Sequence, residues 1–444
     1  MKEGKKEILS YATETGASFN ANPNFGGSLS ETELFFALKL VVEYETGIKI
    51  PASHNGLGYN NLIYMSLKLA KMQADSDRNY LRGNAKVFPV LAIEEPEAHL
   101  HPAMQYKFLK FLRENKDKKK VRQVFVTIHS TQITAAVPLD EIICLHNENN
   151  ELKIGYPGKV FPNNEEGKKA KAYVQRFLDA TKSDMLFAQK VILVEGIAEQ
   201  LLLSTMAKYV NKSLEDGHIA VINVGGRYFD YFLYLFDSNT NPDNLNAVNA
   251  IPKKIACLTD RDPQRKKKTG GNCEKCYPFE YKQDDTQYDY QDYPTNKISQ
   301  YNEKDHPNIH FFSQDANKGK TFEYDLVLCN PTLNLLVTDL MQNQNEIKEL
   351  MQFYQENKPI GDYKEKLRNS EENERIKNSI TVNNSWDEDD KKKAIIASRY
   401  LNSVSKGENA LELACILEEN WEKESREHFV VPCYIKEAIE WICQ

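Results

Sequence analysis

The sequence predicts an α/β protein with two lobes, each built around a parallel sheet. Apolar runs of strand length alternate with helical patterns twice, first over residues 87–136 and again from residue 190 onward. A strand, a helix and a second strand in succession favour parallel pairing. The 444 residues exceed one ordinary domain, and a hydrophobic content of 41% is sufficient for two cores.

The composition excludes several classes of protein. No apolar stretch approaches the roughly 18 residues of a membrane span, and the first residues lack the apolar core of a secretory signal. We therefore expect a cytoplasmic protein with no membrane partner. The eight cysteines are scattered, which favours reduced thiols over a disulfide framework. The net charge of −7 does not indicate a nucleic-acid binder, although a local basic patch or a bound divalent metal can supply the attraction.

Each element of the first lobe has its own local signal. A capping box at residues 30–33, followed by apolar residues at helical spacing, predicts a helix over residues 31–44. The turn-rich string at residues 56–61 leads into a helix over residues 62–72. The continuous apolar run at residues 87–93 is typical of a strand buried on both faces. The remaining expected elements are a helix over residues 102–115, a strand over 123–127 and a short helix after Ser130.

The second lobe follows a polar connection. Residues 147–167 contain one weak strand pattern and then a linker, and we expect linker helices over residues 166–189. The elements expected next are a strand over 191–194, a helix over 197–208, a strand over 219–223, a helix over 228–236 and a strand over 254–259. Residues 263–307 are polar and predict a long loop or insertion. Helices are expected from residue 322, with residues 369–393 mobile.

Two acidic residues end the central strand of the first lobe. Glu94 and Glu95 follow the apolar run directly, and His129 lies just after the next strand. In nucleotide hydrolysis, one such carboxylate joins a Mg²⁺ shell and the next activates the attacking water. Two adjacent acids alone are better explained as a solvated turn, so the inference depends on the complete string over residues 90–102.

That string resembles the Walker B and D-loop region of the ABC-type ATPases, in the form used by their DNA-repair relatives. The resemblance implies a magnesium-shell role for Glu94, a water-activating role for Glu95 and a γ-phosphate-sensing role for His129. The sequence contains no GxxxxGK string followed by Ser or Thr. We therefore expect residues 1–165 to be an ABC-type ATPase lobe without its P-loop, which binds ATP only if another polypeptide supplies that loop.

Four further acidic residues follow two strands of the second lobe. Glu195 ends the strand at residues 191–194 and Glu199 lies one helical turn later, so both carboxylates can face one point. Asp260 and Asp262 end another strand at i, i+2 spacing, which directs them to the same side. Four carboxylates this close would repel one another unless a cation lay among them. The pattern predicts a divalent-metal site.

The order of these acids resembles the Toprim domain shared by topoisomerases, primases and OLD-family nucleases. An ABC-type lobe fused directly to Toprim resembles the overcoming-lysogenization-defect (OLD) family, which includes the Gabija-type anti-phage nucleases. The resemblance implies a Toprim domain over residues 190–444, and it implies that Lys406 stabilises the cleaved phosphate. Supporting strings lie at residues 178–188, 320–326 and 431–436. The metal ligands implied by the resemblance, around two Mg²⁺ or Mn²⁺ ions, are Glu195, Glu199, Asp260, Asp262, Thr321 and Glu323.

The expected function is metal-dependent endonucleolytic cleavage of double-stranded DNA, controlled by the ATPase lobe. The catalytic residues would be Glu195, Asp260, Asp262 and Lys406. By resemblance alone we expect a homo-oligomer acting in anti-phage defence, with a chain that carries the Walker A segment, or a helicase of the same system, as candidate partners. The alternative is a sensor that binds nucleic acid and signals to an effector without cutting. A topoisomerase is disfavoured, because it needs a tyrosine nucleophile in a further domain.

Three weaker signals stay open. The basic run at residues 265–268 either grips a phosphate backbone or is solvated loop charge. Lys320 is an alternative to Lys406 as the catalytic lysine. Cys273 and Cys276 form a CxxC string, but a zinc site needs two more ligands, so structural zinc is disfavoured.

Overall fold

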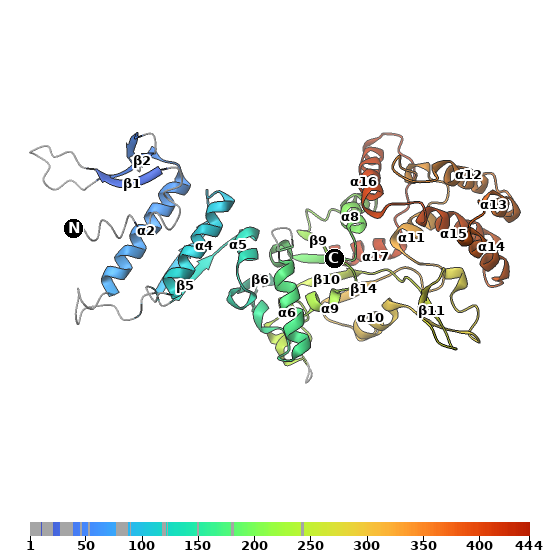
Figure 1. Ribbon diagram of the computed structural model, residues 1–444, viewed down its shortest axis with the longest axis horizontal. Coiled ribbons are helices and arrows are strands. Elements are labelled where there is room, and N and C mark those ends of the chain that lie inside the picture. The colour runs from blue at the N-terminus through green and yellow to red at the C-terminus, as the bar shows by residue number, and fades with distance from the viewer. Residues whose placement is uncertain are drawn as a thin grey trace, which may run out of the picture. The chain divides into compact units, whose positions relative to one another are not determined.

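The computed structural model divides into two compact units (Figure 1). The first comprises Met1–Pro138 with Leu178–Ser183, and the second comprises Leu139–Phe177 with Asp184–Gln444. The residues that the structure describes are 10, 21–26, 39–44, 47–51, 54–76, 88, 90–117, 121, 123–148, 151–178, 182–240 and 244–444. Among the helices in these ranges, none combines the length and the apolar character needed to cross a membrane.

The first unit begins with a three-stranded antiparallel sheet. Its strands are β1 (Ala21–Gly26), β2 (Lys39–Tyr44) and β3 (Lys49–Pro51), paired in that order. The helix expected over residues 31–44 is therefore wrong at its carboxyl end, and residues 31–38 lie outside the described ranges. The physical reason is the Val-Val-Glu-Tyr sequence of β2, because β-branched and aromatic residues suit a paired strand.

The rest of the first unit matches the expected order of elements. These elements are α2 (Leu57–Ser76), β4 (Val90–Glu94), α4 (Pro102–Asp117), β5 (Gln123–Thr127) and α5 (Thr131–Ala136), with β4 and β5 paired in parallel. Phe108 and Phe111 of α4 are buried in the core. The expectation that the first strand is buried on both faces is wrong, because Val90 is 46% exposed and Phe125 of the paired strand 51%. In this two-stranded sheet only alternate side chains, such as Leu91 and Ile93, pack on the core.

The second unit is centred on a four-stranded parallel sheet. Its strands are β8 (Lys190–Val194), β9 (Ile219–Asn223), β10 (Lys254–Leu258) and β14 (Ile309–Phe312), in the spatial order β14-β10-β8-β9. The first three were expected. Residues 191–194 are fully buried, as the continuous apolar pattern predicts. α8 (Ile197–Tyr209) and α9 (Phe229–Leu233) follow β8 and β9, which confirms the helical patterns there.

Residues 139–177 pack with the second unit. They form a hairpin of β6 (Cys144–Glu148) and β7 (Glu151–Gly155), where one strand was expected, and then α6 (Glu165–Phe177). A Cβ atom at Gly155 would lie 2.8 Å from Ile251, so the hairpin approaches the segment before β10 closely. The short α7 (Asp184–Phe187) leads into β8. The expected boundaries at 1–165, 166–189 and 190–444 stay a prediction.

The insertion expected over residues 263–307 is not a loop. It forms an antiparallel sheet of β11 (Gln264–Lys267), β12 (Glu274–Lys275) and β13 (Tyr288–Gln291), followed by α10 (Tyr293–Tyr301). Gly270 and Gly271 both have positive φ and allow the chain to turn between β11 and β12. The tyrosines of β13 suit a strand, although the polar composition concealed it.

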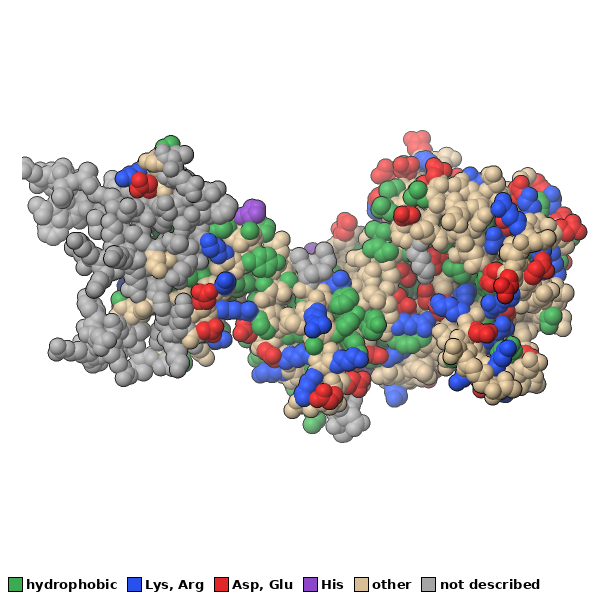
Figure 2. All heavy atoms as spheres, viewed as in Figure 1, with side chains coloured by type: hydrophobic (Ala, Val, Ile, Leu, Met, Phe, Trp, Pro, Cys, Tyr) green, Lys and Arg blue, Asp and Glu red, His purple; other side chains and the backbone are tan. Residues whose placement is uncertain are grey.

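Helices complete the second unit. They are α11 (Phe322–Cys329), α12 (Gln344–Gln355), α13 (Ile360–Lys366), α14 (Glu371–Val382), α15 (Glu388–Leu401), α16 (Lys406–Glu422) and α17 (Cys433–Cys443). The expectation that residues 369–393 are mobile is wrong: Ser370 caps α14, and Ile376 and Ile380 are fully buried. Figure 2 shows acidic and basic side chains mixed over the visible face of these helices.

Candidate functional site

The carboxyl ends of β8 and β10 bring the predicted acids together at one edge of the parallel sheet. Glu195 follows β8, and its Oε1 accepts hydrogen bonds from Thr259 Oγ1 and, at 3.1 Å, from the backbone N–H of Asp260. Both donors follow β10. We call the edge formed by Glu195, Asp260 and Asp262 the carboxylate edge.

Burial makes the charged form of Glu195 costly. It raises the pKa of the carboxyl group, and the nearby charge of Asp262 adds to this effect. The hydrogen bond from Thr259 and the guanidinium of Arg227, whose Nε lies 3.7 Å from Glu195 Oε1, act in the opposite direction. Because the pKa of Glu195 is raised overall, a further cation beside it would stabilise the charged carboxylate.

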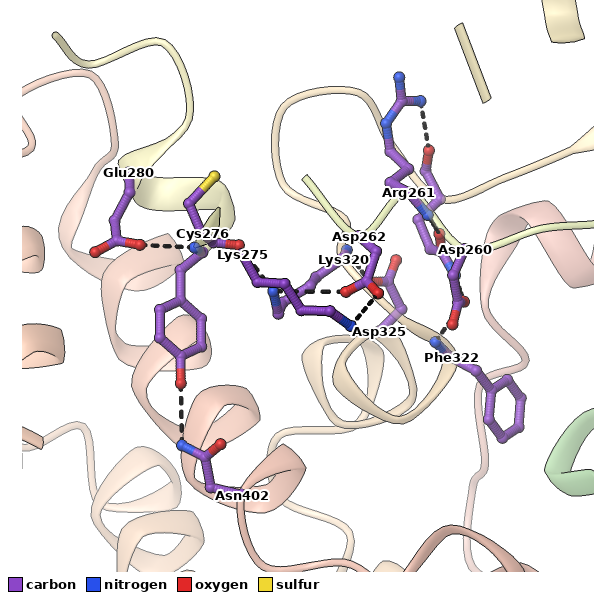
Figure 3. Close-up of polar contacts among 12 residues, drawn as sticks. Asp260, Arg261, Asp262, Lys275, Cys276, Glu280, Lys320, Phe322, Asp325 and Asn402 are labelled. Atoms are coloured by element: carbon purple, nitrogen blue, oxygen red, sulfur yellow. Dashed lines mark hydrogen bonds and ion pairs between the residues drawn. The ribbon is translucent and has the colours of Figure 1, made fainter. Parts of the chain in front are cut away.

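Asp260 connects three elements of the second unit. It is buried, and its Oδ1 accepts from Gln314 Nε2 at 2.6 Å. The same oxygen accepts from the backbone N–H of Phe322 at 2.9 Å (Figure 3). Gln314 follows β14 and Phe322 begins α11. Asp260 therefore fixes the amino-terminal end of α11 beside the end of β10.

Asp262 is surrounded by cations. Figure 3 shows Lys275 and Lys320 directed at its carboxylate, with Lys275 Nζ 2.5 Å from Oδ2 and Lys320 Nζ 3.8 Å from Oδ1. Burial tends to raise the pKa of Asp262, but the hydrogen bond from Lys275 and the charges of Lys320 and Arg227 outweigh burial and lower it. The backbone of Asp262 has φ of 41°, which turns the chain directly after the strand.

The other predicted ligands lie at the starts of two helices. Glu199 is in the first turn of α8 and is buried, and a Cβ atom at Gly196 would lie 2.9 Å from its Oε2, so glycine leaves room for this carboxylate. Thr321 caps the amino-terminal end of α11, and its Oγ1 is buried with no hydrogen-bond partner among the described residues. Glu323 is buried one residue into α11 and lines a small cavity with Ala198 of α8.

The donor chemistry of these residues fits a hard divalent cation, because carboxylate and hydroxyl oxygens are the ligands that Mg²⁺ prefers. The unsatisfied buried Oγ1 of Thr321 is consistent with a missing ligand. Within the described ranges, however, no three His, Cys, Asp or Glu side chains converge closely enough to hold an ion. The metal-ligand roles therefore stay predictions.

Lys406 is the first residue of α16, and its side chain lies outside the described part of the structure. A Cβ atom at the next residue, Gly407, would lie 3.7 Å from Ile197 Cγ2, at the start of α8. The start of α16 therefore lies beside the helix that follows Glu195.

The predicted nucleotide residues of the first unit also share one strand edge. Glu94 ends β4, and the N–H of Glu95 donates to Thr127 O at the end of β5 at 3.0 Å. His129 Nε2 lies 3.5 Å from Glu95 Oε1, and both side chains are mostly exposed. The N–H of His129 donates to Glu97 Oε1 at 2.6 Å. The structure thus brings Glu95 and His129 together, and their roles stay predictions.

Sequence reasoning missed three residues that the structure adds to the carboxylate edge. These are Arg227, Lys275 and Gln314. A signal was available for Arg227, since two adjacent glycines shortly after a strand indicate a close-packed turn. Lys275 lies inside the CxxC string and Gln314 in a polar loop, so neither carries a pattern of its own.

Two family models match the sequence. One, described as AAA ATPase domain, matches residues 1–134, and the other, described as overcoming lysogenization defect protein-like, TOPRIM domain, matches residues 186–262. The chain therefore joins an AAA ATPase domain to an OLD-like Toprim domain, which confirms the expected order of an ATPase lobe and Toprim.

The chain is homologous to named nucleases. Endonuclease GajA of Bacillus cereus (strain HuB5-5) is 27% identical over 241 residues, which cover 50% of this chain and 32% of that protein. The OLD nuclease of Thermus scotoductus (strain ATCC 700910 / SA-01) is 28% identical over 230 residues, covering 50% of this chain and 38% of that protein. The matches thus span between about a quarter and two fifths of the curated relatives' length.

A solved structure, the C-terminal region of the Burkholderia pseudomallei OLD protein, is also similar. It is 19% identical, with a TM-score of 0.30, and the match covers 58% of this chain and 97% of that one.

Proposed function

We propose that this chain is a nuclease that hydrolyses phosphodiester bonds of double-stranded DNA at the carboxylate edge with divalent metal ions. The observation that carries the proposal is the placement of Glu195, Asp260 and Asp262 after neighbouring strands at one edge of a parallel sheet, within a segment that matches an OLD-like Toprim domain. The names of the curated relatives support nuclease chemistry.

The protein's own residues have distinct tasks in this proposal. Glu195 and Asp262 present carboxylates at the edge, and Asp260 holds the start of α11, with Thr321 and Glu323, against it. Lys406 would stabilise the negative charge that develops on the phosphate. Bound divalent ions would polarise the phosphate and activate water. Lys320 fits a structural role better than a catalytic one, because it is buried and donates to Cys276 O at 2.7 Å.

A plasmid-nicking assay tests the function. Supercoiled plasmid should be cut with Mn²⁺ or Mg²⁺ and left intact with EDTA. Glu195→Gln should lower the rate by about a hundredfold or more, because it removes a charged metal ligand without changing shape. Glu440→Ala, a change on α17 of a residue whose side chain is 45% exposed, is the control. Metal-dependent cutting by Glu195→Gln at the wild-type rate would exclude the Toprim assignment.

The same assay separates the two candidate lysines. Lys406→Ala should slow cutting by about a hundredfold while the affinity for Mn²⁺ is kept, the usual scale for one preorganised charge. Lys320→Ala should mainly lower the melting temperature, since it removes a buried hydrogen bond. If Lys320→Ala keeps its stability and loses cutting while Lys406→Ala is silent, the assignment of the lysines is reversed.

We infer a broader role from the family resemblance. The ATPase lobe would control cutting, the chain would act as a homo-oligomer, and the biological role would be defence against phage. If plasmid is bound but not cut with any divalent metal, the alternative role as a nucleic-acid sensor is favoured.

A further inference from the structure

The loop after β9 is tied to the carboxylate edge by its backbone. Val224 N donates to Val194 O and Gly226 N donates to Glu195 O, both at 2.9 Å. Gly225 and Gly226 have φ of 76° and 113°, which side-chain-bearing residues rarely adopt. The next residue, Arg227, is therefore delivered to a fixed point beside Glu195.

The guanidinium of Arg227 lies among the acids but bonds to them weakly. Its Nε is 3.7 Å from Glu195 Oε1 and an Nη atom is 3.9 Å from Asp262 Oδ2, both too long for hydrogen bonds. The same group donates to Asp260 O at 3.3 Å and stacks 5.0 Å from the Tyr293 ring centroid. Among the described residues this is its one hydrogen bond, although arginine has five N–H donors.

Arg227 is not arranged like an arginine that forms a structural ion pair. A bidentate pair would place two nitrogens within about 3 Å of one carboxylate. Here the stack on Tyr293 and the bond to Asp260 O hold the guanidinium in place, and its side chain is 30% exposed. The remaining donors are free to bind an anion that approaches the edge, whereas Lys320 is buried and bonded to a carbonyl.

We propose that Arg227 is a phosphate-binding residue that grips the nucleic-acid backbone at the carboxylate edge. A phosphodiester brings a negative charge to an edge that already carries three carboxylates, so a fixed cation is needed beside any metal. A planar fork of donors matches phosphate oxygens better than an ammonium does. The inference rests on the proposed function for the identity of the ligand.

The salt dependence of DNA binding tests this role. A labelled short duplex is titrated at several salt concentrations in Ca²⁺ buffer, and a gel confirms that it stays intact. Arg227→Ala should weaken binding roughly tenfold and lower the slope of log K against log salt by about 0.9, the effect of one lost phosphate contact. Arg227→Lys keeps the charge, so it should keep the slope and recover part of the affinity.

Arg426→Ala is the matched control. Arg426 stacks on Trp421, which contacts Tyr209 at the far end of α8, about 20 Å along the helix from Glu195. Its removal should leave the slope unchanged. If Arg227→Ala has the wild-type slope and affinity, Arg227 is a structural partner of the acids and the inference fails, even if the protein cuts DNA. If no variant cuts but the slope falls only for Arg227→Ala, the inference stands and the nuclease proposal fails.

Discussion

At the scale of single residues, Asp262 has three cationic partners. Lys275, Lys320 and Arg227 each place a nitrogen within 4 Å of its carboxylate. Lys275 comes from the inserted sheet, and its side chain is 68% exposed. A metal ion that binds Asp262 must therefore compete with Lys275, which can move away from the carboxylate into solvent.

Lys275→Ala should tighten Mn²⁺ binding by about two- to fivefold, the range available to an ion pair with a largely exposed lysine. Removing the lysine frees Asp262 Oδ2 and removes a repelling charge. Isothermal titration with Mn²⁺ in the absence of DNA measures the change directly. Lys267→Ala, an exposed lysine on the neighbouring strand β11, should leave the affinity unchanged. Weaker binding by Lys275→Ala would show that Lys275 helps to build the site.

Asp325, in the first turn of α11, gives the fold a pH dependence. Burial raises the pKa of its carboxyl group from 3.8 to about 8, against the opposing hydrogen bond from Lys320 N at 3.0 Å. Between these two pH values the folded protein holds a proton that the unfolded chain releases. Folding therefore takes up a proton, and the free energy of unfolding falls as the pH rises toward 8.

Asp325→Asn should abolish this contribution, because the amide stays neutral and its oxygen still accepts from Lys320 N. Relative to the wild type, the variant should gain up to about 1.4 kcal/mol of stability for each pH unit between about pH 5 and about pH 7.5. Urea titrations in EDTA, followed by tryptophan fluorescence, measure it. All three tryptophans, Trp386, Trp421 and Trp441, lie in the second unit. Parallel pH profiles for the two proteins would contradict the assignment.

At the scale of secondary structure, a buried lysine completes the short helix α7. Lys253 Nζ donates to Met185 O at 3.3 Å, to Leu186 O at 2.6 Å and to Ala188 O at 2.5 Å. Burial lowers its pKa to about 8. One ammonium thus satisfies carbonyls at a helix end that leads directly into β8.

Lys253→Met should lower the free energy of unfolding by roughly 2–4 kcal/mol, since several buried carbonyls lose a charged donor while the volume is kept. The urea midpoint from tryptophan fluorescence should fall accordingly. Lys212→Met, at an exposed position after α8, is expected to change it little. If both substitutions lower the urea midpoint equally, the effect comes from the loss of a positive charge in general and not from the loss of the bonds to the α7 carbonyls.

The sequence predicts an element correctly when the pattern that identifies it lies within the element itself. β8 and β10 are buried on both faces, so their apolar runs identify them directly. The Leu, Val and Val of β2 fit both the helical and the strand period over a short run, and the pairing of β2 with β1 decides between them. β11–β13 and α14 are rich in polar residues, and their packing partners lie elsewhere in the chain. No local apolar pattern therefore predicts them.

At the scale of the whole molecule, the acids of the candidate site were predictable and their cations were not. Glu195, Asp260 and Asp262 stand at strand ends, where sequence order fixes position. Arg227 and Lys275 reach the same edge from a loop and from an inserted sheet. The glycine pair before Arg227 indicates a tight turn but not its position beside the acids, and nothing in the local sequence of Lys275 specifies its approach.

The ATPase domain leads to a prediction about nucleotide. A P-loop's amides and lysine supply most contacts to nucleotide phosphates, and the sequence has no such string. We therefore expect the purified chain to bind labelled ATP without saturation in the micromolar range, and ATP to leave plasmid cutting unchanged. Glu95→Gln should behave as the wild type in both assays. Micromolar binding with steady turnover would reveal a phosphate site of another kind.

The anchoring of the sheet by α17 has a consequence for synthesis. Lys190 at the start of β8 donates to Ile442 O at 2.8 Å, across 252 residues, and Lys254 donates to Trp441 O at 2.6 Å. A ribosome needs roughly 10 to 50 seconds to make the intervening chain. Throughout that interval the apolar strands lack the cover that α17 provides. In the nascent protein, the face of the sheet that α17 covers therefore stays open to solvent until α17 has emerged.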